Sequence, residues 1–241
     1  MKLSGKLGIV TGGGSGIGRA IAERIVAEGG SVLITGRRED VLAQAAGEID
    51  PQKVHPCVAD VRRPAEATRT VEAAIKTLGG LHFLVNNAGV VVTKNSHDVS
   101  EAEFDLEIGT NLKGAFFMAQ AAIRHFRGQR SGAILNIGSA AGIVATPKMA
   151  AYGASKAALI HMTQTLALEY AKEGIRCNCI SPGTVDTGII PKALATLLVS
   201  RHPLGRLGTP QEVAALAVQV LADESAWMTG SSLVLDGGVS L

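Results

Sequence analysis

Thr11-Gly12-Gly13-Gly14-Ser15-Gly16-Ile17-Gly18 is the stretch that decides the fold of this chain. The apolar run Leu7–Thr11 leads into it, and apolar residues at helical spacing follow it as far as Gly29–Gly30. A short apolar run, a cluster of glycines and an amphipathic segment are typical of a strand, a tight turn and a helix. The stretch therefore predicts the first βα unit of a parallel sheet.

The same alternation of strand and helix signals continues along the chain, which predicts an α/β fold with helices covering a parallel sheet. A length of 241 residues suits one domain, residues 1–241. Helices are expected over 38–49, from 64, over 109–127, 151–172 and 210–221, and 185–204 is read as a loop with a short helix. Strands are expected at Leu7–Thr11, Ser31–Thr35, Val54–Val58, Leu81–Val85, Ala133–Ile137, Ile175–Ile180 and Ser232–Leu235.

Composition excludes several classes of protein. The net charge is +2 with acids and bases intermixed, so we expect no nucleic-acid partner. No apolar run approaches about 18 residues, so no membrane span is expected. The N-terminus lacks a secretory apolar region, and we expect a cytoplasmic protein. Three cysteines, an odd number, and six scattered histidines argue against a disulfide framework and a metal site.

The glycine-rich stretch also has a chemical interpretation. Glycines allow positive φ and let backbone N–H groups approach a ligand. The N-terminus of a helix presents free N–H donors and the positive end of the helix dipole, which suit a pyrophosphate. The strict G-x-G-x-x-G pattern does not occur; the spacing here is G-x-x-x-G-x-G at Gly12, Gly16 and Gly18. A turn that needs glycines only for its shape is the alternative, and the flanking strand and helix favour nucleotide binding.

The end of the second expected strand bears on which nucleotide is bound. NAD-binding units often place an acid there to bind the ribose 2′-hydroxyl. This chain has Gly36-Arg37-Arg38, and a guanidinium suits a 2′-phosphate where an acid would repel it. Arg37 and Arg38 therefore favour NADP(H). NAD(H) stays open, because the two arginines could also simply begin a solvated helix.

Tyr152 and Lys156 stand one helical turn apart, with Ser139 upstream. A phenol keeps its proton up to a pH of about 10, and a nearby ammonium lowers that pKa. Such a phenol can exchange a proton with a reacting oxygen, while a serine hydroxyl binds the same oxygen. By spacing alone, the pair could equally be a surface tyrosine and a solvated lysine.

Taken in order, the glycine turn, Asn87-Ala88-Gly89, Ser139 and Tyr152-x-x-x-Lys156 resemble the compact, single-domain branch of the short-chain dehydrogenase/reductase family. The segments Gly205–Ala214 and Val234–Gly238 also look like that branch, so the resemblance covers essentially the whole chain. A methyltransferase can begin with a similar glycine turn but needs no Tyr–Lys pair. The resemblance implies a Rossmann-type doubly wound sheet of seven strands in the order 3-2-1-4-5-6-7.

The resemblance also implies roles for individual residues. Ser139 and Tyr152 would bind and protonate the carbonyl oxygen, Lys156 would bind the nicotinamide ribose, and Asn111 would hold a water of a proton relay. A buried Asn111 could instead be purely structural. Ser15 departs from NADP-preferring relatives, which often have a basic residue there, so the NADP(H) prediction rests on the two arginines. The implied cofactor-binding residues are Gly12, Ser15, Gly16, Ile17, Gly18, Arg37, Arg38, Asp60, Val61, Asn87, Ala88, Gly89, Tyr152, Lys156, Pro182, Gly183, Val185 and Thr187.

The expected reaction is hydride transfer between a nicotinamide and the carbon of a ketone or secondary alcohol. The segments 140–149 and 185–198 should form a mostly apolar pocket for this small-molecule substrate, although some of these side chains could belong to the core or to a subunit contact. The pocket candidates are Ile143, Val144, Met149, Ile189, Ile190, Leu194 and Leu197.

Two other functions stay open. A 3-oxoacyl group on acyl carrier protein would need basic residues near the entrance, for which Arg124, Arg127, Arg130 and Lys172 are candidates, although solvated helix ends also explain them. A non-catalytic NADP-binding regulator is the other alternative. The family resemblance implies a homotetramer built through 109–127, 151–172 and 232–235.

Overall fold

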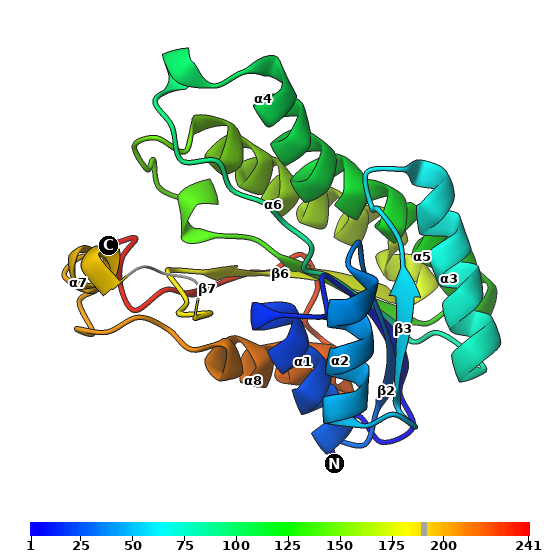
Figure 1. Cartoon of the computed structure of the whole chain (residues 1–241). Coiled ribbons are helices and arrows are strands. Elements are labelled where there is room, and N and C mark those ends of the chain that lie inside the picture. Colours follow the sequence, from blue (N-terminus) through cyan, green and yellow to red (C-terminus); the bar gives the residue numbers. More distant parts are fainter. Residues whose placement is uncertain (189–191) are drawn as a thin grey trace.

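The computed structural model describes residues 1–188 and 192–241. Seven strands form a parallel sheet in the order β3-β2-β1-β4-β5-β6-β7, which confirms the predicted topology (Figure 1). Each strand begins and ends within two residues of its predicted bounds. The strands are β1 (Leu7–Thr11), β2 (Ser31–Gly36), β3 (Val54–Val58), β4 (Phe83–Asn86), β5 (Gly132–Ile137), β6 (Ile175–Pro182) and β7 (Ser232–Leu235).

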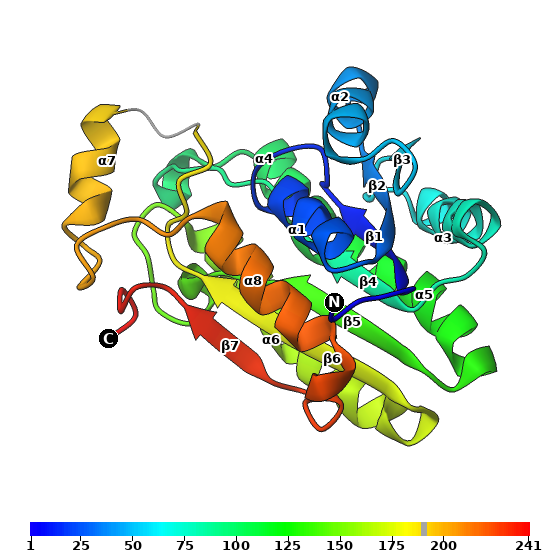
Figure 2. The same cartoon turned by 90° about the horizontal axis from the view of Figure 1, so that it is seen from below.

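Helices cover both faces of the sheet (Figures 1 and 2). One layer contains α1 (Gly16–Ala27), α2 (Glu39–Ile49) and α8 (Pro210–Leu221), and the other contains α3 (Pro64–Leu78), α5 (Ala115–Gln129) and α6 (Ala150–Tyr170). Successive strand residues point to opposite faces, so Val10 packs in the first layer and Ile9 in the second. Both faces of the central strands are buried, and this is why their sequences are continuous apolar runs.

The helix predicted over 109–127 begins earlier than expected. α4 (Glu101–Ile108) starts at Ser100, whose side chain and that of Glu103 form a reciprocal capping box. It continues through a π-helical turn, Gly109–Gly114, directly into α5. The predicted start at Gly109 was wrong because that glycine has an ordinary helical φ of −60° and does not interrupt the helix.

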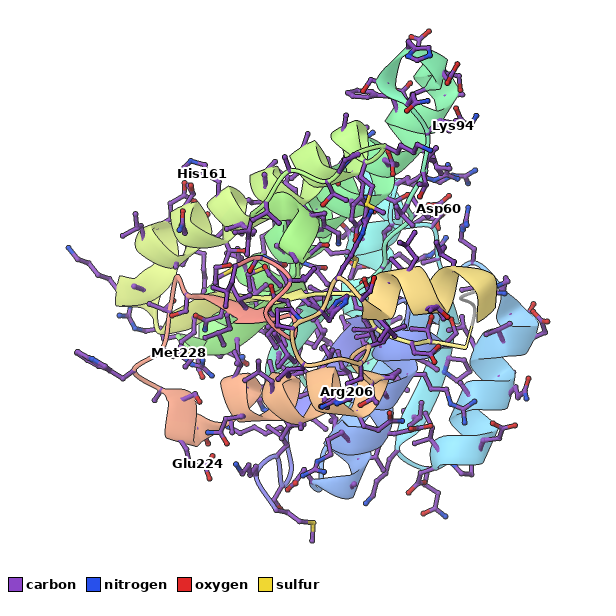
Figure 3. The ribbon with its side chains drawn as sticks, turned by 90° about the vertical axis from the view of Figure 1, so that its left-hand side faces the viewer. Asp60, Lys94, His161, Arg206, Glu224 and Met228 are labelled. Carbon is purple, nitrogen blue, oxygen red and sulfur yellow. The ribbon has the colours of Figure 1, made fainter. Side chains whose placement is uncertain are left out.

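The loop expected over 185–204 contains the predicted short helix, α7 (Lys192–Val199). α7 lies at the carboxyl end of the sheet, on the side that faces the viewer in Figure 3. Two of the pocket candidates, Ile189 and Ile190, lie outside the described residues. Among the described helices, none combines the length and apolar character needed to span a bilayer.

Candidate active site and cofactor-binding cleft

A cleft of about 340 Å³ opens at the carboxyl ends of β1, β2, β3 and β4. It lies where the strand order reverses, between β1 and β4, which is where doubly wound sheets bind ligands. We call it the glycine-turn cleft. Eleven of the eighteen predicted cofactor-binding residues line it: Gly12, Ser15, Ile17, Arg37, Arg38, Asp60, Val61, Asn87, Ala88, Gly89 and Thr187.

The glycine turn can exist only with glycines at particular positions. Gly12 and Gly16 have φ values of +65° and +54°, which side-chain-bearing residues rarely adopt. A Cβ on Gly18 would lie 2.3 Å from the carbonyl oxygen of Gly12, so helix α1 can pack against the turn only without a side chain there. Ser15 is the N-cap of α1, and its side chain makes no capping hydrogen bond. The first N–H groups of α1 therefore remain available to an anion such as a pyrophosphate.

Thr11 joins the glycine turn to the segment after β4. Its hydroxyl accepts hydrogen bonds from the backbone N–H groups of Asn87 and Ala88, both at 3.0 Å. The Asn87 amide donates back to the Thr11 carbonyl at 2.9 Å. These bonds hold two walls of the glycine-turn cleft together. Sequence reasoning missed this role of Thr11, and the only available signal was a polar residue ending a buried strand.

Two cations line the glycine-turn cleft just after the end of β2. Arg37 and Arg38 are exposed, and neither forms an ion pair within residues 1–188 and 192–241. The nearby acid is Asp60, which is labelled in Figure 3. It is paired with Arg62 at 2.5 Å, and this guanidinium lowers the pKa of the Asp60 carboxyl. The paired acid leaves Arg37 and Arg38 able to bind an anion.

Ser139 and Tyr152 line a second cavity, of about 460 Å³, which we call the Ser139–Tyr152 cavity. Ser139 follows β5 and caps a short 3₁₀ segment, where its hydroxyl accepts a hydrogen bond from the N–H of Ala141 at 3.2 Å. Tyr152 lies in the first turn of α6 and Lys156 one turn later, as predicted. The ammonium of Lys156 is 5.8 Å from the centroid of the Tyr152 ring and donates to the carbonyl of Ile137 at 2.7 Å.

The protonation of this pair differs from the expectation that Lys156 lowers the pKa of Tyr152. Burial raises the pKa of the Tyr152 phenol, and a hydrogen bond with Ser139 opposes that rise. Burial also lowers the pKa of Lys156 to about 8. The expectation fails here because the ammonium is directed to the Ile137 carbonyl, while loss of water around the phenol is the larger effect.

Asn111 is buried in the π-helical turn and connects three parts of the site. Its side chain accepts from the N–H of Val90 at 2.8 Å and donates to the carbonyl of Val90 at 2.9 Å. It also donates to the hydroxyl of Ser155 at 3.0 Å, which in turn donates to the backbone carbonyl of Tyr152. Asn111 thus has the structural role that was left open. Its role in a proton relay stays a prediction.

Comparison with known proteins identifies the family. Residues 12–240 match the family model described as enoyl-(acyl carrier protein) reductase. The chain is 36% identical to 3-oxoacyl-(acyl-carrier-protein) reductase FabG of Thermotoga maritima, over 99% of both chains. It is 33% identical to 2-(S)-hydroxypropyl-CoM dehydrogenase 3 of Xanthobacter autotrophicus, over 99% of this chain and 98% of the relative. A crystal structure from Sinorhizobium meliloti 1021, assigned as a short-chain alcohol dehydrogenase, matches with a TM-score of 0.94 and 36% identity, over 99% of this chain and 97% of that one.

The chain belongs to the short-chain dehydrogenase/reductase family. It is therefore an oxidoreductase of alcohols or ketones that uses a nicotinamide cofactor. The residues present fit that cofactor, because the glycine turn leaves no room for side chains and presents free N–H groups beside two unpaired guanidinium groups.

Most of the other predicted binding residues of this short-chain dehydrogenase/reductase lie at or after the end of β6, and Lys156 lies in α6. Thr187 approaches the glycine turn, since a Cβ on Gly16 would lie 3.2 Å from its methyl group. Pro182 and Gly183 line the Ser139–Tyr152 cavity, and Val185 bridges to Gly208. Lys156 lies buried behind Tyr152, 3.6 Å from where a Cβ on Gly89 would stand.

Of the five predicted pocket residues that the structure describes, two line the Ser139–Tyr152 cavity and three do not. Val144 and Met149 line the Ser139–Tyr152 cavity, but Ile143, Leu194 and Leu197 are exposed and do not line it. Leu198 lines it instead, as do two polar residues that sequence reasoning missed, Arg201 and His202. No sequence signal marked them, because they follow a short helix whose position over the site depends on the tertiary fold.

The basic residues considered for an acyl carrier protein lie away from this cavity. Arg127 pairs with Glu173 at 2.6 Å, and Arg130 donates to the carbonyl of Lys172. Arg127 and Arg130 lie shortly before β5 begins, at the end of the sheet opposite Ser139. Arg124 bonds Gln120 on the surface of α5. The alternative interpretation as solvated helix ends fits these contacts.

Proposed function

We propose that the enzyme reduces a ketone to a secondary alcohol with NADPH. The observation that carries this proposal is the position of the Ser139 and Tyr152 hydroxyls on the wall of one cavity, with the ammonium of Lys156 directly behind the phenol ring. Two hydroxyl groups can bind one carbonyl oxygen together, and charge that develops on that oxygen is then stabilised by both.

The roles of the residues follow from this arrangement. The reduced nicotinamide, when bound, supplies the hydride to the carbonyl carbon. Ser139 donates a hydrogen bond to the carbonyl oxygen, and Tyr152 transfers its phenolic proton to the same oxygen as general acid. The raised pKa keeps Tyr152 protonated before transfer, as an acid requires. Lys156 binds the nicotinamide ribose and supplies positive charge beside the phenolate that forms.

The preference for NADPH rests on Arg37 and Arg38. Both line the glycine-turn cleft. The neighbouring acid, Asp60, forms its ion pair with Arg62 and not with either of these two arginines. A planar guanidinium can bind a 2′-phosphate through two parallel hydrogen bonds. NADH remains the alternative.

The competing substrate is a 3-oxoacyl group on acyl carrier protein, and the similarity to the Thermotoga maritima reductase favours it. Comparison of turnover between an acetoacetyl thioester and simple alkyl or aryl ketones separates the two. The direct test of the proposal follows the absorbance of NADPH and NADH across a ketone panel. Failure of every ketone and thioester to oxidise either cofactor would leave the non-catalytic regulator as the better interpretation.

The assembly that fits this function is a homotetramer. Phe116 on α5 and Leu168 on α6 expose 40% and 84% of their surface, and Val234 on β7 exposes 48%. These residues lie on the three segments through which the tetramer was predicted to form. Sedimentation velocity on the wild type and on Leu168→Glu tests this, with dissociation expected in the variant.

A further inference from the structure

The Ser139–Tyr152 cavity contains a cation that the proposed reaction does not use. Arg201 lines the cavity, and no aspartate or glutamate is among the described residues that do so. Within the described chain, Arg201 forms no ion pair. Most of the remaining wall is apolar, formed by residues such as Val91, Ala145 and Met149. The lining therefore combines hydroxyl-bearing side chains, Ser139 and Tyr152 among them, with hydrocarbon surface and one arginine that has no ion pair in the described part of the chain.

The side chain of Arg201 is exposed, and its backbone is held beside the cavity by the neighbouring residue. His202 is 4% exposed, and its Nδ1 bonds the carbonyl of Leu198 at 2.8 Å while Nε2 accepts from the N–H of Thr184 at 3.2 Å. These partners assign the neutral tautomer with the proton on Nδ1. His202 thus ties the end of α7 to the segment after β6, and neither of its ring nitrogens is left for a substrate. A second bond, from the N–H of Leu204 to the carbonyl of Gly237, holds the chain that follows.

We propose that the substrate is a ketone whose far end carries a carboxylate or sulfonate, and that Arg201 binds this anion while Ser139 and Tyr152 bind the carbonyl. The inference rests on the proposed function and adds the substrate class to it. An anion placed against apolar walls loses hydration, so it needs a paired cation to bind there. A guanidinium meets both kinds of anion with parallel N–H donors.

A series of paired substrates tests this inference. The oxo acids 4-oxopentanoate, 5-oxohexanoate and 6-oxoheptanoate are each compared with the methyl ketone that has an isopropyl group in place of the carboxylate. The comparison of 4-acetylbenzenesulfonate with 4′-methylacetophenone tests the sulfonate. We expect kcat/KM for at least one anionic member to exceed that of its neutral partner by about tenfold or more, mainly through KM.

Variants locate the effect. Arg201→Met should remove the anion preference, and Arg201→Lys should retain part of it. Arg124→Met removes an exposed cation outside the cavity and should leave both the anion preference and the turnover of the neutral ketones unchanged. Reduction of neutral ketones with no anion preference in any pair would overturn the inference and leave the proposed function standing.

Equilibrium binding separates the two proposals. Calorimetric titration of the best oxo acid into the enzyme with oxidised cofactor needs no turnover. About a tenfold weaker dissociation constant in Arg201→Met supports the anion site even if no ketone is reduced, in which case the proposed reaction is wrong. Equal dissociation constants for the wild type and Arg201→Met, whatever the turnover, would contradict the anion site.

Discussion

The glycine-turn cleft and the Ser139–Tyr152 cavity are built in different ways. The walls of the cleft are short connections at the ends of adjacent strands, joined by bonds such as that from Asn87 to the hydroxyl of Thr11. One wall of the cavity comes from Leu198, Arg201 and His202, at and just after the end of α7, a segment attached through His202 to the chain that follows β6. The sheet therefore fixes the walls of the cleft, whereas one wall of the cavity depends on a separate segment.

The largest effect should come from the reacting group that the cavity presents. Tyr152→Phe removes the transferable proton, and turnover should fall by about 10²–10⁴-fold while NADPH affinity is unchanged. Steady-state kinetics and a cofactor titration measure both. Tyr170→Phe, at the other end of the same helix, is the matched control and should keep wild-type turnover. Near-complete activity of Tyr152→Phe would show that another group supplies the proton.

The next largest effect, a loss of cofactor affinity, is expected from a substitution of Gly18 in the glycine turn of the cleft. Gly18→Ala places a methyl group 2.3 Å from the Gly12 carbonyl, so the turn must move, and cofactor affinity should fall by about ten- to a hundredfold. Gly47→Ala is the control, because a Cβ at Gly47 in α2 meets no atom within 4 Å. The control should bind cofactor normally and unfold at a slightly higher temperature. Equal affinity in the wild type and Gly18→Ala would mean that the turn does not hold the cofactor.

A smaller effect is expected on the preference of the cleft for NADPH over NADH. Arg37→Asp should weaken NADPH binding by about tenfold or more, because it removes a phosphate-binding cation and adds a repelling charge, whereas NADH binding should change little. Fluorescence titration with both cofactors gives the ratio. Arg124→Asp reverses a charge far from the cleft and controls for long-range electrostatics. Parallel losses for NADPH and NADH would remove the argument for NADPH.

The smallest effect concerns the stability of the cofactor-free protein at alkaline pH. Burial lowers the pKa of Lys156 from 10.5 to about 8, so between these values the unfolded chain binds more protons than the folded one. The free energy of unfolding of the wild type, relative to Lys156→Met, should therefore rise with pH over this range, by roughly 1–3 kcal/mol in total.

Denaturant titrations at several pH values measure this difference between two proteins, which cancels the titration of groups they share, such as the buried cysteine thiols. A difference for Lys156→Met that does not change with pH would show that the lysine stays protonated or hydrated in the folded protein.

Much of the fold, and the placement of Tyr152 and Lys156 one turn apart on a helix, could be predicted because local sequence patterns determine them. A strand buried on both faces is a run of apolar residues, and Tyr152 and Lys156 share a helix whose period sets their spacing. The missed start of α4 was also local, since Ser100 and Glu103 have capping-box spacing. The pocket prediction failed for Leu194 and Leu197 because apolar character alone does not say which face of a short helix turns toward a cavity.

By itself, the sequence determined the α/β alternation, the glycine turn and the identity and spacing of Ser139, Tyr152 and Lys156, because strand burial, positive φ and helical period act between near neighbours. Only the tertiary structure decided that burial raises the pKa of Tyr152 and lowers that of Lys156, since desolvation depends on everything packed around a group. It also decided that Arg201 lines the same cavity as Ser139 and Tyr152. That placement depends on His202 joining two segments 18 residues apart, a contact that no local pattern contains.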